Sequence, residues 1–229
     1  MEHKEHQRRL FRGELALAIA VVINSLGVVL MLYSGAGISA ISSVPYAFSQ
    51  VFSFFSLGTW TYIFQAALII SLMVLRRRVV VNYLFSFAVG FVFSQFLDLH
   101  ELWVNLLPEG LAWQIAYFVI SYLLICFGIA LSNRCKLPII PTDLFPRELA
   151  QISGISYPRI KISFDAICLM VTAGMTFFFL GHMRGIGIGT VMAAFTMGKV
   201  IGLMGDCLDR HFVFDIHHRT GERKVHRFS

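Results

Sequence analysis

The stretch LALAIAVVINSLGVVLMLYS at residues 15–34 decides the fold, because none of its residues carries a charge. At about 1.5 Å per residue, a helix of this length crosses the hydrocarbon core of a bilayer, which is about 30 Å thick. Lipid offers the backbone no hydrogen-bonding partner, so such a run must be helical. The stretch therefore predicts a membrane-spanning helix.

Comparable apolar runs recur along the chain. They predict six spans, at residues 13–34, 57–75, 79–99, 112–132, 164–182 and 187–207. The composition agrees, since 57% of the residues are hydrophobic and 14% are charged, roughly half the charged share of a soluble domain. This excludes a soluble enzyme, a disordered chain and a disulfide-stapled secreted domain. We expect an all-α polytopic membrane protein.

The basic residues predict the orientation. If the N-terminus is cytoplasmic, all 19 Lys and Arg lie on the cytoplasmic side except Arg184, which lies outside, and Lys199, which lies in a span. The reverse topology contradicts the positive-inside rule. We expect both termini, residues 1–12 and 209–229, to be basic cytoplasmic segments. The net charge of +6 then serves contact with anionic lipid, and no nucleic-acid partner is expected.

The two halves of the chain resemble each other through an ordered series of matches. The matched pairs are 27–30 with 128–131 and Pro45 with Pro146 (offset 101), 64–66 with 164–166 (offset 100), and Gly90 with Gly198 and Asp98 with Asp206 (offset 108). Each half holds three spans, an odd number, so the halves enter the membrane from opposite sides. We expect residues 13–110 and 111–208 to form two inverted three-helix repeats, as in many secondary transporters.

A shorter helical pattern lies between the first two spans of each half. Residues 38–55 have an apolar stripe at helical spacing and no charge, and residues 139–155 repeat the stripe with charged residues added. Ser42 and Asp143 are candidate N-caps of these helices. Each half should therefore carry an amphipathic helix, which either lies at the membrane interface or is re-entrant.

Four short motifs carry a family resemblance: YSGAGIS at 33–39, LGTW at 57–60, GIGIGT at 185–190 and GKVIG at 198–202. With these motifs the chain resembles the YczE/YyaS/YitT family of bacterial integral membrane proteins over most of residues 20–208. Lys199 departs from the pattern, which has an uncharged residue there. The resemblance implies a multi-pass protein of the bacterial inner membrane with a poorly defined role.

Ionisable residues inside spans are costly and so are candidates for function. Lys199 lies near the middle of the last span and is expected to pair with Asp165 or Asp206. Such a group is a proton or ion relay, a site for an anionic solute, or a structural ion pair. Asp98 and Asp206 are repeat-related, so they should lie at opposite ends, as gates or as hydrated helix ends.

Uncharged polar residues add further candidates. Gln65 and Asn24 lie within spans. Gly187, Gly189 and Thr190 begin the last span, where free amides favour an anion, although small residues at this spacing equally favour close helix packing.

No catalytic triad, phosphate loop or metal motif is present, and the four cysteines lack CxxC spacing, so we expect no enzyme activity, cofactor or metal. The inverted repeat favours a small-solute transporter that works by alternating access. Two alternatives stay open: a non-transporting regulator or scaffold, and the substrate-capturing component of a larger transporter. The expected partners are the lipid bilayer, a small-molecule solute and a second copy of the chain.

Overall fold

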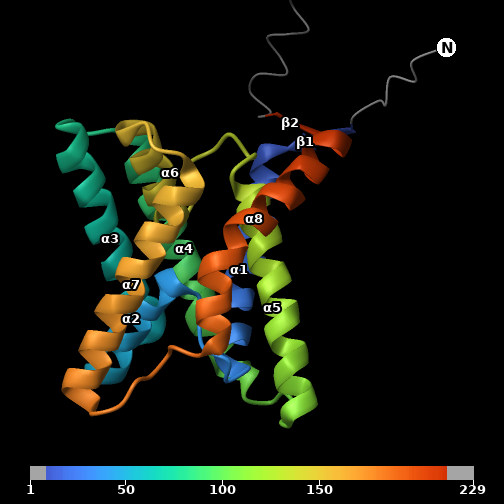
Figure 1. Ribbon diagram of the computed structural model, residues 1–229. Coiled ribbons are helices and arrows are strands. Elements are labelled where there is room, and N and C mark those ends of the chain that lie inside the picture. Colours follow the sequence, from blue (N-terminus) through green and yellow to red (C-terminus); the bar gives the residue numbers. More distant parts are fainter. Residues whose placement is uncertain (1–8, 216–229) are drawn as a thin grey trace, which may run out of the picture.

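The computed structural model describes residues 9–215, which fold into eight helices and two short strands (Figure 1). The helices are α1 (Gly13–Tyr33), α2 (Ala40–Val51), α3 (Leu57–Arg76), α4 (Val81–Val104), α5 (Leu111–Ser132), α6 (Pro141–Ser153), α7 (Tyr157–Leu180) and α8 (Ile188–His211), and the strands are β1 (Arg9–Arg12) and β2 (Phe212–Asp215). Six of the helices, all but α2 and α6, are long and apolar enough to cross a membrane. The predicted all-α class and number of spans are confirmed, apart from the small sheet.

The main difference from the predicted spans is the start of α7, which begins at Tyr157 rather than at residue 164. Pro158 suits this position because the first turn of a helix needs no backbone donor there. The extension places Lys161, which lies outside the predicted span, at a buried position within the helix. The short helices also begin two residues before the predicted caps, so Ser42 and Asp143 lie in the first turn.

The helices form two bundles. One consists of α1, α4, α5 and α8, and the other of α2, α3, α6 and α7, which lie together at the left of Figure 1. α1 and α5 pack along each other at the centre of the first bundle, where Val28, Ile125 and Ile129 belong to the main hydrophobic core.

The contacts between helices have a two-fold pattern. Exchanging α1–α4 for α5–α8 turns each helix contact into another observed one: α1·α4 becomes α5·α8, α2·α7 becomes α3·α6, and α3·α4 becomes α7·α8. The close approaches between α1 and α5 match as well, since Gly27 faces the Ile125 side chain and Gly128 faces Asn24. Residues 24 and 125 differ by the same offset of 101 as the two glycines. This pattern supports the predicted repeat, although the inversion itself stays a prediction.

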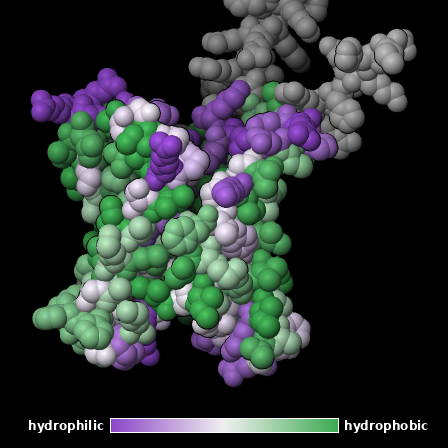
Figure 2. Space-filling model, viewed as in Figure 1, coloured by the Kyte–Doolittle hydropathy of each residue, from purple (hydrophilic) through white to green (hydrophobic). Residues whose placement is uncertain are grey.

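The surface has the layout of a membrane protein. Figure 2 shows apolar residues over the middle of the visible face and hydrophilic residues gathered at its two ends. Large apolar side chains such as Phe85, Phe178 and Ile188 are exposed, which fits contact with a lipid bilayer.

The two described termini meet at one end of the molecule. β1 pairs in parallel with β2, and Phe11 packs against Phe212 and Phe214. We call this end, which also carries Arg76–Arg78, the basic end, and the other end the opposite end. The predicted tail segments 1–8 and 216–229 lie outside the described residues.

Candidate functional site

The two short helices begin at one internal cavity between the bundles. This central cavity has a volume of about 40 Å³, enough for a few water molecules. Its lining includes the first turns of both short helices and polar groups from α1 and α7: Ser39, Ile41, Ser42, Ile140, Thr142, Asp143, Asn24 and Lys161. From the cavity, α2 runs towards the opposite end and α6 towards the basic end (Figure 1).

Asn24 brings an unsatisfied amide to the central cavity. Its side chain is 4% exposed, and neither its oxygen nor its nitrogen has a hydrogen-bond partner among residues 9–215. A buried polar group without a partner costs about 1–3 kcal/mol. The cavity is therefore suited to a polar species that satisfies this amide, such as water, an ion or part of a solute.

A buried ion pair lies beside this amide. Lys161 Nζ donates to both carboxylate oxygens of Asp165 at 2.6 Å, one helical turn apart on α7. The expected pairing of Asp165 with Lys199 is not found, because Lys199 is exposed and forms no ion pair with any residue that the structure describes. The i,i+4 spacing of Lys161 and Asp165 in the sequence indicates such a pair, but Lys161 lies outside the predicted span, which begins at residue 164.

Asp143 adds a second carboxyl group to the cavity. It is buried, and within the described chain its side chain forms no hydrogen bond. Burial raises its pKa to about 6, while the nearby positive charges of Lys161 and Arg147 act in the opposite direction. Since Lys161 is paired with Asp165, Asp143 lines the cavity as a carboxyl group without a hydrogen-bond partner among residues 9–215.

The first half of the chain has neutral residues at the equivalent places. The offsets pair Lys161 with Thr61 and Asp165 with Gln65. Gln65 is fully buried, its amide lacks a partner in the described part of the chain, and it packs against Gly90. The structure thus makes Gln65 a polar core residue outside the lining of the cavity.

The opposite end is closed by a junction between the α1–α2 linker and the start of α8. The amide of Gly189 donates to the carbonyl of Ala36 at 3.0 Å, and the amide of Ile38 donates to the carbonyl of Gly185 at 3.1 Å. A Cβ atom at Gly187 would collide with the Ala36 carbonyl oxygen.

The remaining polar groups of this region also have partners inside the protein. Thr190, which is fully buried, accepts a hydrogen bond from the Gly187 amide at 3.2 Å. The contacts of Gly187, Gly189 and Thr190 therefore match the packing alternative and leave few amides for an anion. Asp98 lies at the same end, where it accepts hydrogen bonds from the Gly58 amide at 2.7 Å and the Ser56 hydroxyl at 2.8 Å, and so caps α3.

The basic end has a pocket beside the segments that the predicted repeat pairs with this junction. It measures about 870 Å³ and lies between the start of α4, the α5–α6 linker and α6. The repeat offsets pair Ala36 with Leu137 and Gly189 with Val81, but no backbone hydrogen bond joins Val81 to Leu137 in the described chain. Asp206, the counterpart of Asp98, is exposed and caps no helix there.

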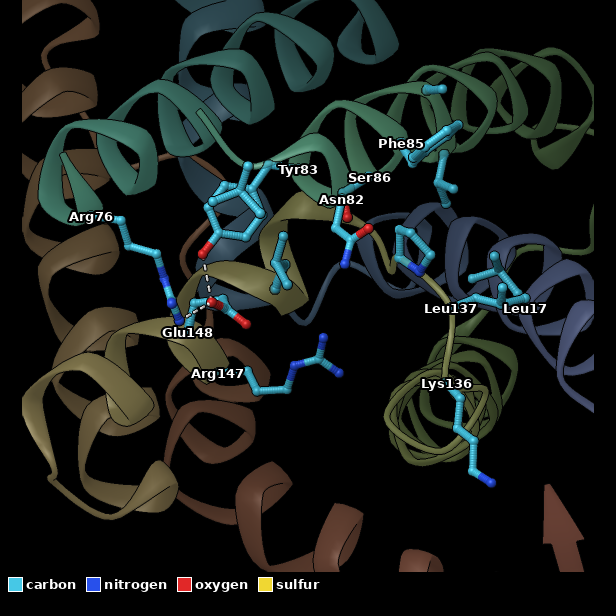
Figure 3. A pocket seen from close by; sticks show the side chains of 15 residues that line it. Leu17, Arg76, Asn82, Tyr83, Phe85, Ser86, Lys136, Leu137, Arg147 and Glu148 are labelled. Atoms are coloured by element: carbon cyan, nitrogen blue, oxygen red, sulfur yellow. Dashed lines mark hydrogen bonds and ion pairs between the residues drawn. The ribbon is translucent and has the colours of Figure 1, made fainter. Parts of the chain in front are cut away.

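Charged groups line this basic-end pocket (Figure 3). Glu148 accepts hydrogen bonds from Arg76 and from the Tyr83 hydroxyl, both at 2.5 Å. Arg147, which precedes Glu148 on α6, points into the opening of the pocket. Asn82 points towards Arg147, whereas Lys136 points away from the pocket. A pocket that presents a guanidinium and an amide is suited to a solute with a carboxylate or phosphate group.

Comparison with known proteins adds a family without a known activity. No curated protein and no solved structure matches the chain. A family model described as a family of unknown function (DUF6198) matches residues 11–206, which is most of the chain. The YczE/YyaS/YitT resemblance stays an expectation, since no named relative supports it. This protein, with its six apolar helices and its central cavity, belongs to the DUF6198 family.

Proposed function

We propose that this protein is a small-solute transporter that works by alternating access between two inverted halves. The observation that carries the proposal is the contrast between its ends. At the opposite end, the α1–α2 linker and the start of α8 are joined by backbone hydrogen bonds. At the basic end, the equivalent segments border a pocket of about 870 Å³. Two related junctions, one closed and one open, are what one state of an alternating transporter requires.

The helix arrangement supports this proposal in a second way. Both short helices start at the central cavity and run from it towards different ends, as re-entrant helices do. Non-helical backbone is tolerated at membrane depth where it borders a polar cavity or packs against protein. The linkers before α2 and α6 meet this condition, because Ser39 and Ile140 line the cavity.

The distribution of basic residues gives the proposed transporter a direction. Arg76–Arg78 lie at the basic end, and only Arg184 lies between α7 and α8 at the opposite end. By the positive-inside rule the basic end faces the cytoplasm. The structure then corresponds to an inward-open state, in which a solute enters or leaves between α4 and α6.

The test compares two equivalent positions in a protein whose four cysteines have been replaced. Asn82 lines the basic-end pocket, and Thr190 is its counterpart at an offset of 108 on α8. Each is changed to Cys in turn, and the rate of labelling by a membrane-impermeant thiol reagent is measured in vesicles from either side. We expect Asn82→Cys, at an exposed position, to be labelled and Thr190→Cys, at a fully buried position, to be protected.

Gly187→Ala then disturbs the closed junction, because the added Cβ collides with the Ala36 carbonyl oxygen. We expect labelling to fall at Asn82→Cys and to rise at Thr190→Cys, each by about fivefold or more. Gly198→Ala is the matched control on the same helix, since its Cβ meets nothing within 4 Å. If Gly187→Ala leaves both rates unchanged in folded protein, the two ends are not coupled and the transporter proposal fails.

A further inference from the structure

The structure contains a carboxyl group that the proposed function does not yet use. Asp143 lies in the first turn of α6, lines the central cavity and is buried. Lys161 faces the same cavity, but both oxygens of Asp165 already bind its ammonium group. Asp143 therefore shares the cavity with the unpartnered amide of Asn24, and its side chain has no hydrogen-bond partner within the described chain.

We propose that Asp143 binds the coupling proton of this transporter, an inference that rests on the proposed function. In the inward-open state a hydronium ion in the water that enters at the basic end gives a proton to the Asp143 carboxylate: one O–H bond of the hydronium ion breaks, and the O–H bond of the carboxylic acid forms. After the junctions exchange, the O–H bond breaks and the proton passes to water at the opposite end. No oxidant, reductant or other reactant is needed.

The groups around Asp143 decide between a proton and a metal ion. From α7 it faces Lys161, Asp165 and Tyr157, and on its own helix it faces Arg147. The charged or phenolic groups nearby on α3 and α4, Arg76 and Tyr83, bind Glu148 instead. Two cationic side chains close to the cavity oppose a sodium ion, whereas a proton needs no coordination shell. Burial moves the pKa of Asp143 up to about 6, within reach of cellular pH.

Arg147 links protonation of Asp143 to binding of the solute. Asp143 and Arg147 are one turn apart on α6, with the carboxyl group at the central cavity and the guanidinium at the basic-end pocket. Protonation removes a negative charge beside Arg147, so its attraction for an anionic solute increases. The arrangement favours uptake of a proton together with an anion.

The first measurement follows the labelling ratio of Asn82→Cys to Thr190→Cys between about pH 5 and pH 7. Across this range the protonated fraction of a group with a pKa of about 6 changes roughly tenfold. We expect the ratio to change with a midpoint near this pKa, and the change to disappear in Asp143→Asn. Asp143→Ser, which copies Ser42 of the first half, should behave likewise. Glu109→Gln is the control, since Glu109 is exposed and far from the cavity lining.

The second measurement does not depend on transport. Infrared spectroscopy of the whole protein should show the carbonyl band of a protonated carboxyl group that titrates near pH 6 and is missing in Asp143→Asn. If Gly187→Ala switches the two labelling sites but neither the ratio nor the band depends on Asp143, this inference is overturned and the transporter proposal stands. If sodium shifts the ratio at constant pH while protons do not, the proton is the wrong ion. If Gly187→Ala switches nothing, the transporter proposal fails, and the band alone decides whether Asp143 binds a proton.

Discussion

The two halves of the protein place different chemistry on the same helices. In the second half, α6 and α7 bring Asp143, Lys161 and Asp165 to the middle of the molecule. In the first half, the offsets place Ser42, Thr61 and Gln65 at these positions, and none of them is charged. The helix contacts have a two-fold pattern, but only the second half carries charged residues at these positions. The charges are therefore not required to form this arrangement of helices.

The largest expected effect comes from breaking the buried ion pair of the second half. Lys161→Met leaves Asp165 as an unpaired charge that is 2% exposed, which should lower the free energy of unfolding by about 3–5 kcal/mol. The double change Lys161→Thr with Asp165→Gln copies the first half and should recover most of this loss. Unfolding by a denaturing detergent measures both. A double variant no better than the single one would show that the halves are not interchangeable here.

The next effect concerns Asp143, whose pKa burial raises from 3.8, the ordinary value of an aspartate, to about 6 in the folded protein. The folded state binds the proton more tightly, so stability is greatest at low pH and falls as pH rises from about 4 to about 6. Asp143→Asn cannot ionise, and it should raise the stability at neutral pH by up to about 3 kcal/mol and flatten this dependence. Unfolding curves at several pH values check the expectation, and a variant as pH-dependent as the parent would contradict it.

A smaller effect separates the repeat-related carboxylates at the two ends. Asp98 caps α3, so Asp98→Ala should reduce stability by about 1 kcal/mol. Asp206 caps nothing in the described chain, and Asp206→Ala should change stability by less than about 0.5 kcal/mol. The same unfolding assay compares the two variants. Equal losses would mean that Asp206 also holds its end together.

The sequence was sufficient to predict the membrane spans, because an apolar run of this length has few alternatives to a membrane-spanning helix. The prediction was wrong where charged residues belong to the first turns of a helix. Arg159 and Lys161 lie in a predicted cytoplasmic loop, yet α7 begins at Tyr157 and buries Lys161 against Asp165. Position along a helix also does not tell which face a residue occupies, so Lys199 seemed buried although it is exposed.

The candidate site could be predicted only in part for the same reason. Asn24, Gln65 and Asp165 were identified because polar groups in spans are costly. Asp143 was noted as a cap, but its place at the central cavity depends on how α6 packs between α3 and α7. That packing joins residues far apart in the chain, and a single sequence does not encode it in any local pattern.

The most direct test of the central claim closes the open end. Val81 and Leu137 are the counterparts of Gly189 and Ala36, which are hydrogen bonded at the closed end. With both changed to Cys, alternating access predicts that a short thiol crosslinker joins them, and that the trapped protein protects Asn82 and exposes Thr190 to solvent. If the two cysteines never crosslink, or if crosslinking leaves residue 190 as protected as before, the ends do not alternate and the account is wrong.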